Sequence, residues 1–299
     1  MHILTRGDLD GLTCCALLTE AESIQEIRFA HPKDCQDGKV VADEQCIVAN
    51  LPFILGCGMW FDHHASEGAR LPDRNSYRGR FEMAPSCARV IYNHYQSALA
   101  EKFARFAHLL EETDRLDSAQ LTMEDVERPA GWILLGMTLD PRSGMGAEFH
   151  KYFRWLVEFV KEVPLEKVLR HPEVKKRTDR VLQEQEVMKA LLAKHARLEG
   201  GVIVTDLRGL PEKPVGNRFL VYAMFPEAYV ELRIFDGHQG GAVVAVGQNI
   251  FNRPCPLNIG TLLSGYGGGG HAGAGTAQFT AAEAEGMIGQ ILYRLKAFS

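Results

Sequence analysis

The sequence lacks several features that would assign it to a special class of protein. It has no run of about 18 apolar residues, so no membrane-spanning helix is expected. None of its seven cysteines forms a C-x-x-C pair and their number is odd, which indicates buried thiols, with neither a disulfide framework nor a zinc cage. The net charge of -5 provides no basic field for long nucleic acids. Acidic residues appear before any signal-like apolar core, and we expect a cytoplasmic protein without membrane contact.

The composition is that of a globular protein of ordinary type. Hydrophobic residues make up 46% of the chain and charged residues 24%. The length of 299 residues accommodates two cores, because domains cluster at roughly 100 to 200 residues. The sequence contains no internal repeat and no low-complexity tract. Two domains are therefore the expected organisation.

The first half of the chain alternates short apolar runs with helical periodicity. This alternation is typical of a parallel sheet whose strands are joined by crossover helices. The predicted strands are His2–Thr5, Glu26–Ala30, Cys46–Ala49 and Gly58–Phe61, and the predicted helices are Leu12–Glu20, Ser86–Ser97 and Lys102–Thr113.

A charge-rich helical region from about Pro172 to Leu198 separates this half from the rest, and Gly200-Gly201 then breaks the pattern. We place the domain boundary near residue 195. The C-terminal part is predicted to be a small α/β unit with strands beginning at Gly201 and at Ala228–Phe235 and Ala242–Gln248, a glycine-rich stretch at 265–275, and a helix at Ala281–Lys296. The fold class is thus α/β: a doubly wound, mainly parallel sheet in residues 1–190, a smaller α/β domain in residues 196–299, and a cleft between them.

Acidic and imidazole side chains follow the predicted strands. Asp8 and Asp10 come after the first strand, two residues apart, so on an extended segment they face the same way. Asp62-His63-His64 ends the apolar run Gly58–Phe61. Alone, the first cluster also fits a turn with a helix-capping aspartate, and the second fits a strand that leaves the core into a polar turn.

Two further segments belong with these. Asn50 ends the third predicted strand and offers only a carbonyl oxygen or a hydrogen bond. The stretch from Glu111 to Ser118 contains Asp114, although taken singly it reads as a solvated helix end. Ligands of a doubly wound sheet lie at the carboxyl ends of its strands, and carboxylates mixed with imidazole suit Mn²⁺ or Mg²⁺. Together the four clusters predict a divalent metal site.

These motifs, in this order, resemble the DHH phosphoesterases, in particular the exopolyphosphatase-related branch. The resemblance rests on Asp8-x-Asp10-Gly11, Asn50-Leu51-Pro52, Asp62-His63-His64, Asp114, and the run from Gly267 to Gly275 around His271, and it spans nearly the whole chain. It implies a catalytic domain followed by a DHH-associated domain, one or two Mn²⁺ or Mg²⁺ ions, and hydrolysis of phosphorus-oxygen bonds.

The resemblance also implies a role for each matching residue. Asp8 would bind the first metal, and Asp10, His63 and Asp114 the second. Asp62 would orient His63, and His64 would lie toward the phosphate and leaving group. In the C-terminal domain the substrate phosphate would be held by Arg253, Gly268, Gly269, Gly270 and His271.

The sequence departs from the family pattern at two positions. Relatives have a histidine where this chain has Arg6, and a metal-bridging aspartate where it has Asn50. Both changes remove ligands from the first metal site, and Asn50 is left with a supporting role. We infer that Arg6 is either a partial substitute for the missing cation, through a guanidinium that clamps a phosphoryl oxygen, or a surface side chain.

The leading hypothesis is a metal-dependent phosphohydrolase acting on a terminal phosphate or short phosphodiester, such as polyphosphate, a short oligonucleotide or a nucleotide. The alternative is a catalytically degenerate protein that binds phosphate or nucleotides. A third interpretation, a nucleic-acid processing factor, uses Lys175, Lys176, Arg177 and Arg180 as a strip against the phosphate backbone; the simpler interpretation of that strip is a solvated helix face. The partners expected are a small phosphorylated substrate or a short single strand, and a homodimer is compatible with the sequence.

Overall fold

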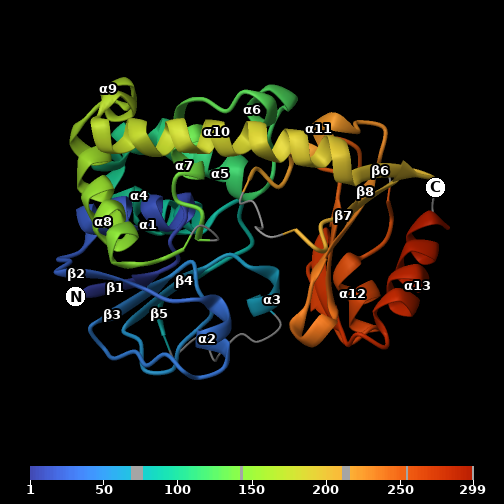
Figure 1. Ribbon diagram of the computed structural model, residues 1–299. Helices are drawn as coiled ribbons and strands as arrows, with labels where there is room; N and C mark the ends of the chain where they lie inside the picture. Colours follow the sequence, from blue (N-terminus) through green and yellow to red (C-terminus); the bar gives the residue numbers. More distant parts are fainter. Residues whose placement is uncertain (69–76, 142–143, 211–215, 254, 298–299) are drawn as a thin grey trace. The chain divides into compact units, whose positions relative to one another are not determined.

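The computed structural model describes residues 1–68, 77–141, 144–210, 216–253 and 255–297 (Figure 1). The chain divides into two compact units. The first unit comprises Met1–Leu121 and Pro129–Val181, and the second comprises Thr122–Arg128 and Leu182–Ser299. The division falls inside the long helix α10 (Pro172–His195).

The first unit contains a five-stranded sheet in the order β2-β1-β3-β4-β5, with every neighbouring pair parallel. Its strands are β1 (His2–Thr5), β2 (Glu26–Phe29), β3 (Cys46–Ala49), β4 (Met59–Asp62) and β5 (Arg78–Phe81). The predicted α/β class is confirmed, and the four predicted strands lie within one residue of the observed ones. Strand β5 was not predicted, because an edge strand with alternating arginines lacks an apolar run.

Successive side chains of the central strands enter two different cores. Ile3, Ile47 and Phe61 are buried in the core on one face of the sheet. Leu4, Val48 and Trp60 are buried in a second core on the opposite face. Because both faces are covered, these strands appear in the sequence as continuous apolar runs.

Helices cover this sheet on both sides. In Figure 1, α1, α4, α5 and α8 lie on one face and α2 on the other. The predicted helix Lys102–Thr113 is two elements, because α4 continues to Phe103 and a 3₁₀ turn (Ala104–Phe106) precedes α5. The helices of this unit are α1 (Leu9–Ala21), α2 (Pro32–Gln36), α3 (Ala65–Gly68), α4 (Cys87–Phe103), α5 (Ala107–Asp117), α7 (Gly131–Met137), α8 (Ala147–Glu162), α9 (Leu165–Arg170) and the first part of α10.

The second unit contains a mixed six-stranded sheet in the order β10-β11-β9-β8-β7-β6. Strands β7 and β8 are parallel, and the other neighbours are antiparallel. The strands are β6 (Ala196–Glu199), β7 (Val202–Asp206), β8 (Val230–Asp236), β9 (Ala242–Gln248), β10 (Gly269–Gly270) and β11 (Ala274–Phe279). The predicted helix to Leu198 is too long, because α10 ends at His195 and Ala196–Glu199 pairs with β7.

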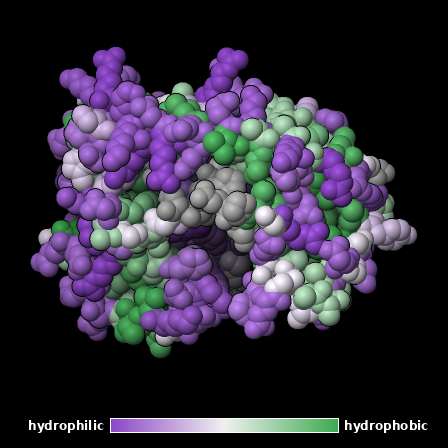
Figure 2. Space-filling view, in the orientation of Figure 1, coloured by the Kyte–Doolittle hydropathy of each residue, from purple (hydrophilic) through white to green (hydrophobic). Residues whose placement is uncertain are grey.

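One face of this second sheet packs against α12 and α13 around its own apolar core. The helices are α6 (Met123–Glu127), α11 (Leu220–Met224), α12 (Ile259–Ser264) and α13 (Ala284–Lys296), and a 3₁₀ turn spans His238–Gly240. The surface in Figure 2 is mostly hydrophilic, with apolar residues in small groups. Among the described residues, no helix is both long and apolar enough to cross a membrane.

The strand order of the first unit determines where its polar side chains gather. The chain passes from β1 to β2 on one side and then returns to β3 on the other side of β1. This reversal is the switch point at which open α/β sheets bind ligands, beyond the carboxyl ends of the strands. Asp8, Asn50 and Asp62-His63-His64 all lie at this edge, after β1, β3 and β4.

Candidate metal centre

The turn after β1 is built around a close approach of backbone to backbone. Asp8 caps α1, and its Oδ1 accepts the N–H of Gly11 at 2.9 Å. A Cβ on Gly11 would lie 2.0 Å from the carbonyl oxygen of Arg6, so only glycine fits. The sequence Asp8-x-Asp10-Gly11 is thus a capped turn that presents two carboxylates at the start of a helix.

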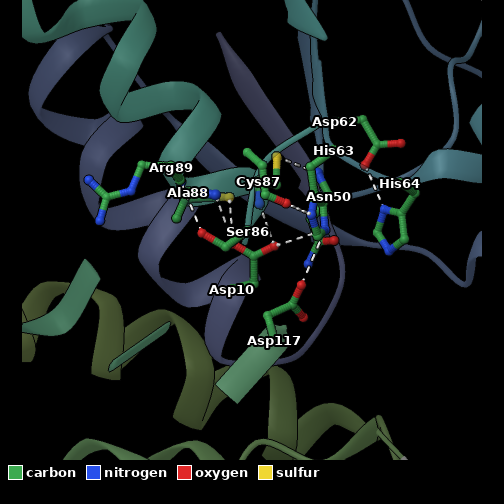
Figure 3. Close-up of polar contacts among 12 residues, drawn as sticks. Asp10, Asn50, Asp62, His63, His64, Ser86, Cys87, Ala88, Arg89 and Asp117 are labelled. Carbon is green, nitrogen blue, oxygen red and sulfur yellow. Dashed lines mark hydrogen bonds and ion pairs between the residues drawn. The ribbon is translucent and has the colours of Figure 1, made fainter. Parts of the chain in front are cut away.

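Asp10 is held by the first turn of another helix. Its two carboxylate oxygens accept the backbone N–H groups of Cys87 and Ala88 at 2.9 and 2.8 Å (Figure 3). These groups belong to the N-terminus of α4, whose partial positive charge favours an anion. The carboxylate is therefore fixed in place although it is only 2% exposed.

His63 and Asp117, from two distant segments, lie beside Asp10. Nε2 of His63 lies 3.8 Å from Oδ2 of Asp10 and 3.2 Å from Oδ2 of Asp117, the last residue of α5. Ligand atoms of these three residues all lie within 4.8 Å of one another. We call Asp10, His63 and Asp117 the metal cluster.

The electrostatics of the metal cluster show two carboxylates that repel. Burial and then the charge of Asp117 raise the pKa of Asp10 to about 7. Burial also raises the pKa of Asp117, whereas the charge of His63 lowers it. Protons or a cation must compensate this charge.

The hydrogen bonds of His63 fit a metal ligand. Its Nδ1 lies 3.0 Å from the carbonyl oxygen of Ala84, which can only accept, so Nδ1 carries a proton and Nε2 is the nitrogen left to bind a cation. Nε2 is buried and has no hydrogen-bond partner among the described residues. An imidazole nitrogen that faces two carboxylates fits a cation between them, and this donor set suits Mn²⁺ or Mg²⁺.

Asp62 was expected to orient His63, and the structure pairs it with His64 instead. Its Oδ1 lies 2.7 Å from Nδ1 of His64. Adjacent residues of an extended chain point to opposite sides, so Asp62 and His64 share a side and His63 lies on the other. Burial lowers the pKa of His64, but the hydrogen bond and charge of Asp62 outweigh it and raise the pKa to about 9.

Asp114 was expected among the metal ligands, and the structure places it elsewhere. Oδ1 accepts the hydroxyl of Ser86 at 2.6 Å, and Oδ2 accepts Nε and Nη2 of Arg89 at 2.8 and 2.5 Å. A carboxylate with a hydroxyl and a guanidinium on its two oxygens links α4 to α5 and is not presented to a metal. Asp117, one helical turn further, is the aspartate of α5 that lies beside His63.

Asp8, the expected ligand of a first metal, is occupied by protein donors. Arg6 Nε lies 3.1 Å from its Oδ2, and Asn50 Nδ2 donates to its Oδ1 at 3.0 Å. Asn50 has a left-handed φ of 57°, a conformation that asparagine tolerates, and it is 1% exposed. The amide of Asn50 thus contacts Asp8, and its supporting role at a metal site stays a prediction.

The expected phosphate-binding residues of the second unit lie on its surface. Arg253 and His271 are both exposed, and Gly268, Gly269 and Gly270 lie at the start of the β10–β11 hairpin. A Cβ on Gly268 would lie 2.2 Å from the carbonyl oxygen of Thr276, and one on Gly270 would lie 2.3 Å from that of Ala274. The N–H of His271 donates to the carbonyl oxygen of Ala274 at 2.7 Å. The glycines therefore allow the close backbone packing of this hairpin.

Two of the four basic residues of the strip on α10 pair with carboxylates of the same helix. Lys175 pairs with Asp179 and Arg177 with Glu173, each at 2.7 Å. The Arg177 guanidinium also lies 4.0 Å from the centre of the Tyr152 ring. These contacts favour a solvated, self-paired helix face over a strip for nucleic acid.

Asp117 and the N-terminus of α4 were missed by sequence reasoning. Leu109, Leu110 and Thr113 form the buried face of α5, and Thr113 bonds Thr13 of α1 through its hydroxyl at 2.8 Å. Asp117 follows Thr113 by four positions, but Asp114 follows the buried Leu110 by four as well, so helical spacing does not separate the two aspartates.

A pGpG-specific phosphodiesterase, PggH from Vibrio cholerae, is a solved structure similar to this chain throughout. The two are 32% identical with a TM-score of 0.85, over 100% of this chain and 99% of that chain. Comparisons with family models and with curated protein sequences gave no match.

Two structures of lower identity share the fold. The exonuclease RecJ bound to manganese is 14% identical with a TM-score of 0.50, over 99% of this chain and 89% of that chain. The DHH domain of a protein described as a member of a ribosomal protein family is 14% identical with a TM-score of 0.56, over 99% and 86%. At this identity the likeness shows the fold alone.

A parallel sheet whose strand β4 ends at Asp62, directly before His63-His64, followed by a second mixed sheet, defines an α/β protein with two sheets. The chain belongs to the DHH family of phosphoesterases. The narrower exopolyphosphatase-related branch stays a prediction.

Proposed function

We propose that this protein is a divalent-metal-dependent phosphodiesterase that hydrolyses short linear dinucleotides, with pGpG as the first candidate. The observation that carries the proposal is the metal cluster, in which the unpartnered Nε2 of His63 faces Asp10 and Asp117 among the described residues. The similarity to PggH over the whole chain supports the choice of substrate.

Asp10, His63 and Asp117 would hold the cation, Mn²⁺ or Mg²⁺. A divalent ion there supplies positive charge to a phosphoryl oxygen and makes a water molecule more acidic. The backbone N–H groups of Cys87 and Ala88 keep Asp10 aimed at this position, and the Ala84 carbonyl keeps the lone pair of His63 on Nε2.

His64 provides a proton donor in this proposal. Its Nδ1 is bonded to Asp62, which is fully buried, and the raised pKa of about 9 keeps the ring an imidazolium at neutral pH. Its Nε2–H would donate to the phosphate and then protonate the leaving oxygen of the ester. A residue with this pKa serves as an acid and not as a base.

The second unit would recognise the distal phosphate through Arg253 and His271. A guanidinium and an imidazole both donate to phosphate oxygens, and both side chains are exposed. This part of the proposal rests on the family resemblance of the glycine-rich hairpin. Loss of affinity for pGpG in Arg253→Ala and His271→Ala, with Mn²⁺ affinity unchanged, would support it.

The decisive experiment uses chromatography to measure the GMP released from pGpG in the presence of Mn²⁺. The rate is compared with the rates of hydrolysis of a cyclic dinucleotide, a short oligonucleotide, a bisphosphorylated nucleoside and polyphosphate. His63→Ala should lower the rate at least about 100-fold, because it removes a ligand of the cation. His108→Ala is the matched control, since that imidazole is 69% exposed on α5. A preference for polyphosphate would overturn the proposed substrate, but the protein would still be a metal-dependent hydrolase of phosphorus-oxygen bonds.

A second candidate is a nucleotide-binding protein without turnover. It is favoured by the pairing of Asp8 with Arg6 and Asn50, which removes that carboxylate from metal binding. Equal background rates in the wild type and His63→Ala, together with retained binding of pGpG, would establish this second function.

A further inference from the structure

The carboxylate of Asp8 is contacted by three donor groups of the protein. Oδ1 accepts from the Gly11 N–H at 2.9 Å and from Asn50 Nδ2 at 3.0 Å. Oδ2 pairs with Arg6 Nε at 3.1 Å. Asp8 is absent from both groups of metal-compatible side chains found among the described residues. A cation at Asp8 would have to displace an arginine and an amide.

Asn50 cannot be recruited as a charged ligand on this side of the site. Its side chain is neutral and its Nδ2 is committed to Asp8. Its backbone is held as well, because its N–H points to the carbonyl oxygen of Phe61 at 3.1 Å and to the Cys87 sulfur at 3.2 Å. In the metal cluster the carboxylates are those of Asp10 and Asp117, beside the imidazole of His63, and the other metal-compatible group among the described residues is Asp62-His63-His64.

Arg6 brings the positive charge of this half of the site. The contact with Asp8 is made by Nε, and the side chain is 40% exposed. Asp8 is the N-cap of α1 and Asp10 lies in the first turn of this helix, so the contact with Asp8 holds Arg6 beside the turn that carries Asp10. A guanidinium offers two parallel donors that match a phosphoryl group.

We infer that this centre binds one divalent cation at Asp10, His63 and Asp117, and that Arg6, fixed by Asp8 and Asn50, supplies the second positive charge by donating to a phosphoryl oxygen of the substrate. Asp8 and Asn50 are then positioning residues for an arginine and not metal ligands. The inference rests on the proposed function for its substrate, but the binding measurements below do not depend on turnover.

The first test counts Mn²⁺ ions per chain by equilibrium dialysis with metal analysis. The wild type and Asp8→Asn should each bind one Mn²⁺ with affinities within about threefold of one another, because Asp8 does not touch the ion. His63→Ala should lose this binding. Two ions in the wild type, or loss of an ion in Asp8→Asn, would overturn the inference.

The second test measures the binding of inorganic phosphate and of GMP to the Mn²⁺-loaded protein by calorimetry. Arg6→Ala should weaken both by about 10-fold to 100-fold, as expected for lost charge-assisted hydrogen bonds, while Mn²⁺ affinity is unchanged. Arg6→Lys should restore part of the affinity, because it returns the charge without the planar fork.

Arg28→Ala is the matched control for Arg6→Ala. Arg28 is also a half-exposed arginine whose Nε pairs with a carboxylate two residues away, that of Glu26 at 2.8 Å. Equal phosphate affinity in Arg6→Ala and Arg28→Ala, with melting curves that show both variants folded, would overturn the role of Arg6. If the protein binds one Mn²⁺ and binds phosphate through Arg6 but does not hydrolyse pGpG, only the proposed function is refuted.

Discussion

Nε2 of His63 lies 3.2 Å from Oδ2 of Asp117, and this contact joins the carboxyl end of β4 to the last turn of α5. The third member, Asp10, reaches the same point from the first turn of α1. The centre therefore depends on α1, α4 and α5 being docked correctly. The buried hydroxyl pair of Thr13 and Thr113 at 2.8 Å sets α1 against α5.

The two aspartates of α5 should respond differently to the same substitution. Asp117→Asn should weaken Mn²⁺ binding by at least about tenfold at unchanged melting temperature, because it removes a charged ligand from the metal cluster. Asp114→Asn should lower the melting temperature and leave the number of bound ions intact, because Asp114 holds Arg89 and Ser86. Calorimetric Mn²⁺ titration and thermal unfolding of both variants make the comparison; the reverse pattern would return the metal to Asp114.

Binding of Mn²⁺ should release protons and strengthen as the pH rises. Burial and the charge of Asp117 raise the pKa of Asp10 to about 7 without a cation, so below that pH the metal must displace a proton. Affinity should rise by up to about tenfold per pH unit below pH 7 and level off above it. Calorimetry at pH values on both sides of this pKa, in two buffers of different ionisation enthalpy, measures the protons released. A flat pH profile would exclude Asp10 as a protonated ligand.

Much of the fold was accessible from sequence because its driving pattern is local. Buried strands such as Cys46–Ala49 are short apolar runs ended by polar residues, and they were placed to within one residue. Strand β5 and helix α8 were not predicted. The first alternates arginine and glycine at a sheet edge, and the second carries its apolar face among many charged residues.

Only those residues of the candidate site that lie close to the carboxyl ends of strands could be predicted from the sequence. His63 directly follows β4, and Asp10 lies in the first turn of the helix after β1, so topology brings both to one edge of the sheet. The choice between Asp114 and Asp117 depends on the rotation of α5 about its axis and on Arg89, which reaches across from α4. Such a side-chain pairing between helices leaves no periodic trace in the sequence.

Asp62 should be needed for His64 and dispensable for the metal. Asp62→Asn keeps the side-chain volume but removes the charge that raises the pKa of His64, so that pKa should fall from about 9 toward the ordinary value. Mn²⁺ affinity should change less than about threefold, because His63 is oriented by Ala84. Titration of the imidazole by NMR and calorimetry tests both parts. If Asp62→Asn impaired metal binding and left the pKa of His64 unchanged, the sequence-based assignment of Asp62 to His63 would be restored.

Gly11 should be the least replaceable glycine of the metal site. In Gly11→Ala the new Cβ would meet the Arg6 carbonyl oxygen at 2.0 Å, so the turn must open, at a cost of about 2 kcal/mol or more in the free energy of unfolding. Gly289→Ala in α13 is the control, since nothing lies within 4 Å of its Cβ position and helix propensity predicts a gain of about 0.5–1 kcal/mol. Urea unfolding of both variants decides; equal stability would show that the turn accommodates a methyl group.

Replacing both departures from the family pattern should create a second metal position. In the double variant Arg6→His with Asn50→Asp, an imidazole and a carboxylate replace the guanidinium and the amide that now contact Asp8. The negative charges of Asp8, Asp10 and the new aspartate then favour the binding of another cation. The double variant should bind two Mn²⁺ where the wild type binds one, and phosphate affinity should no longer depend on position 6. Each single variant is the control, because Arg6→His alone leaves the neutral Asn50 in place and Asn50→Asp alone leaves Arg6 to pair with the added charge. A stoichiometry of one in the double variant would mean that these two residues do not by themselves keep the second ion out.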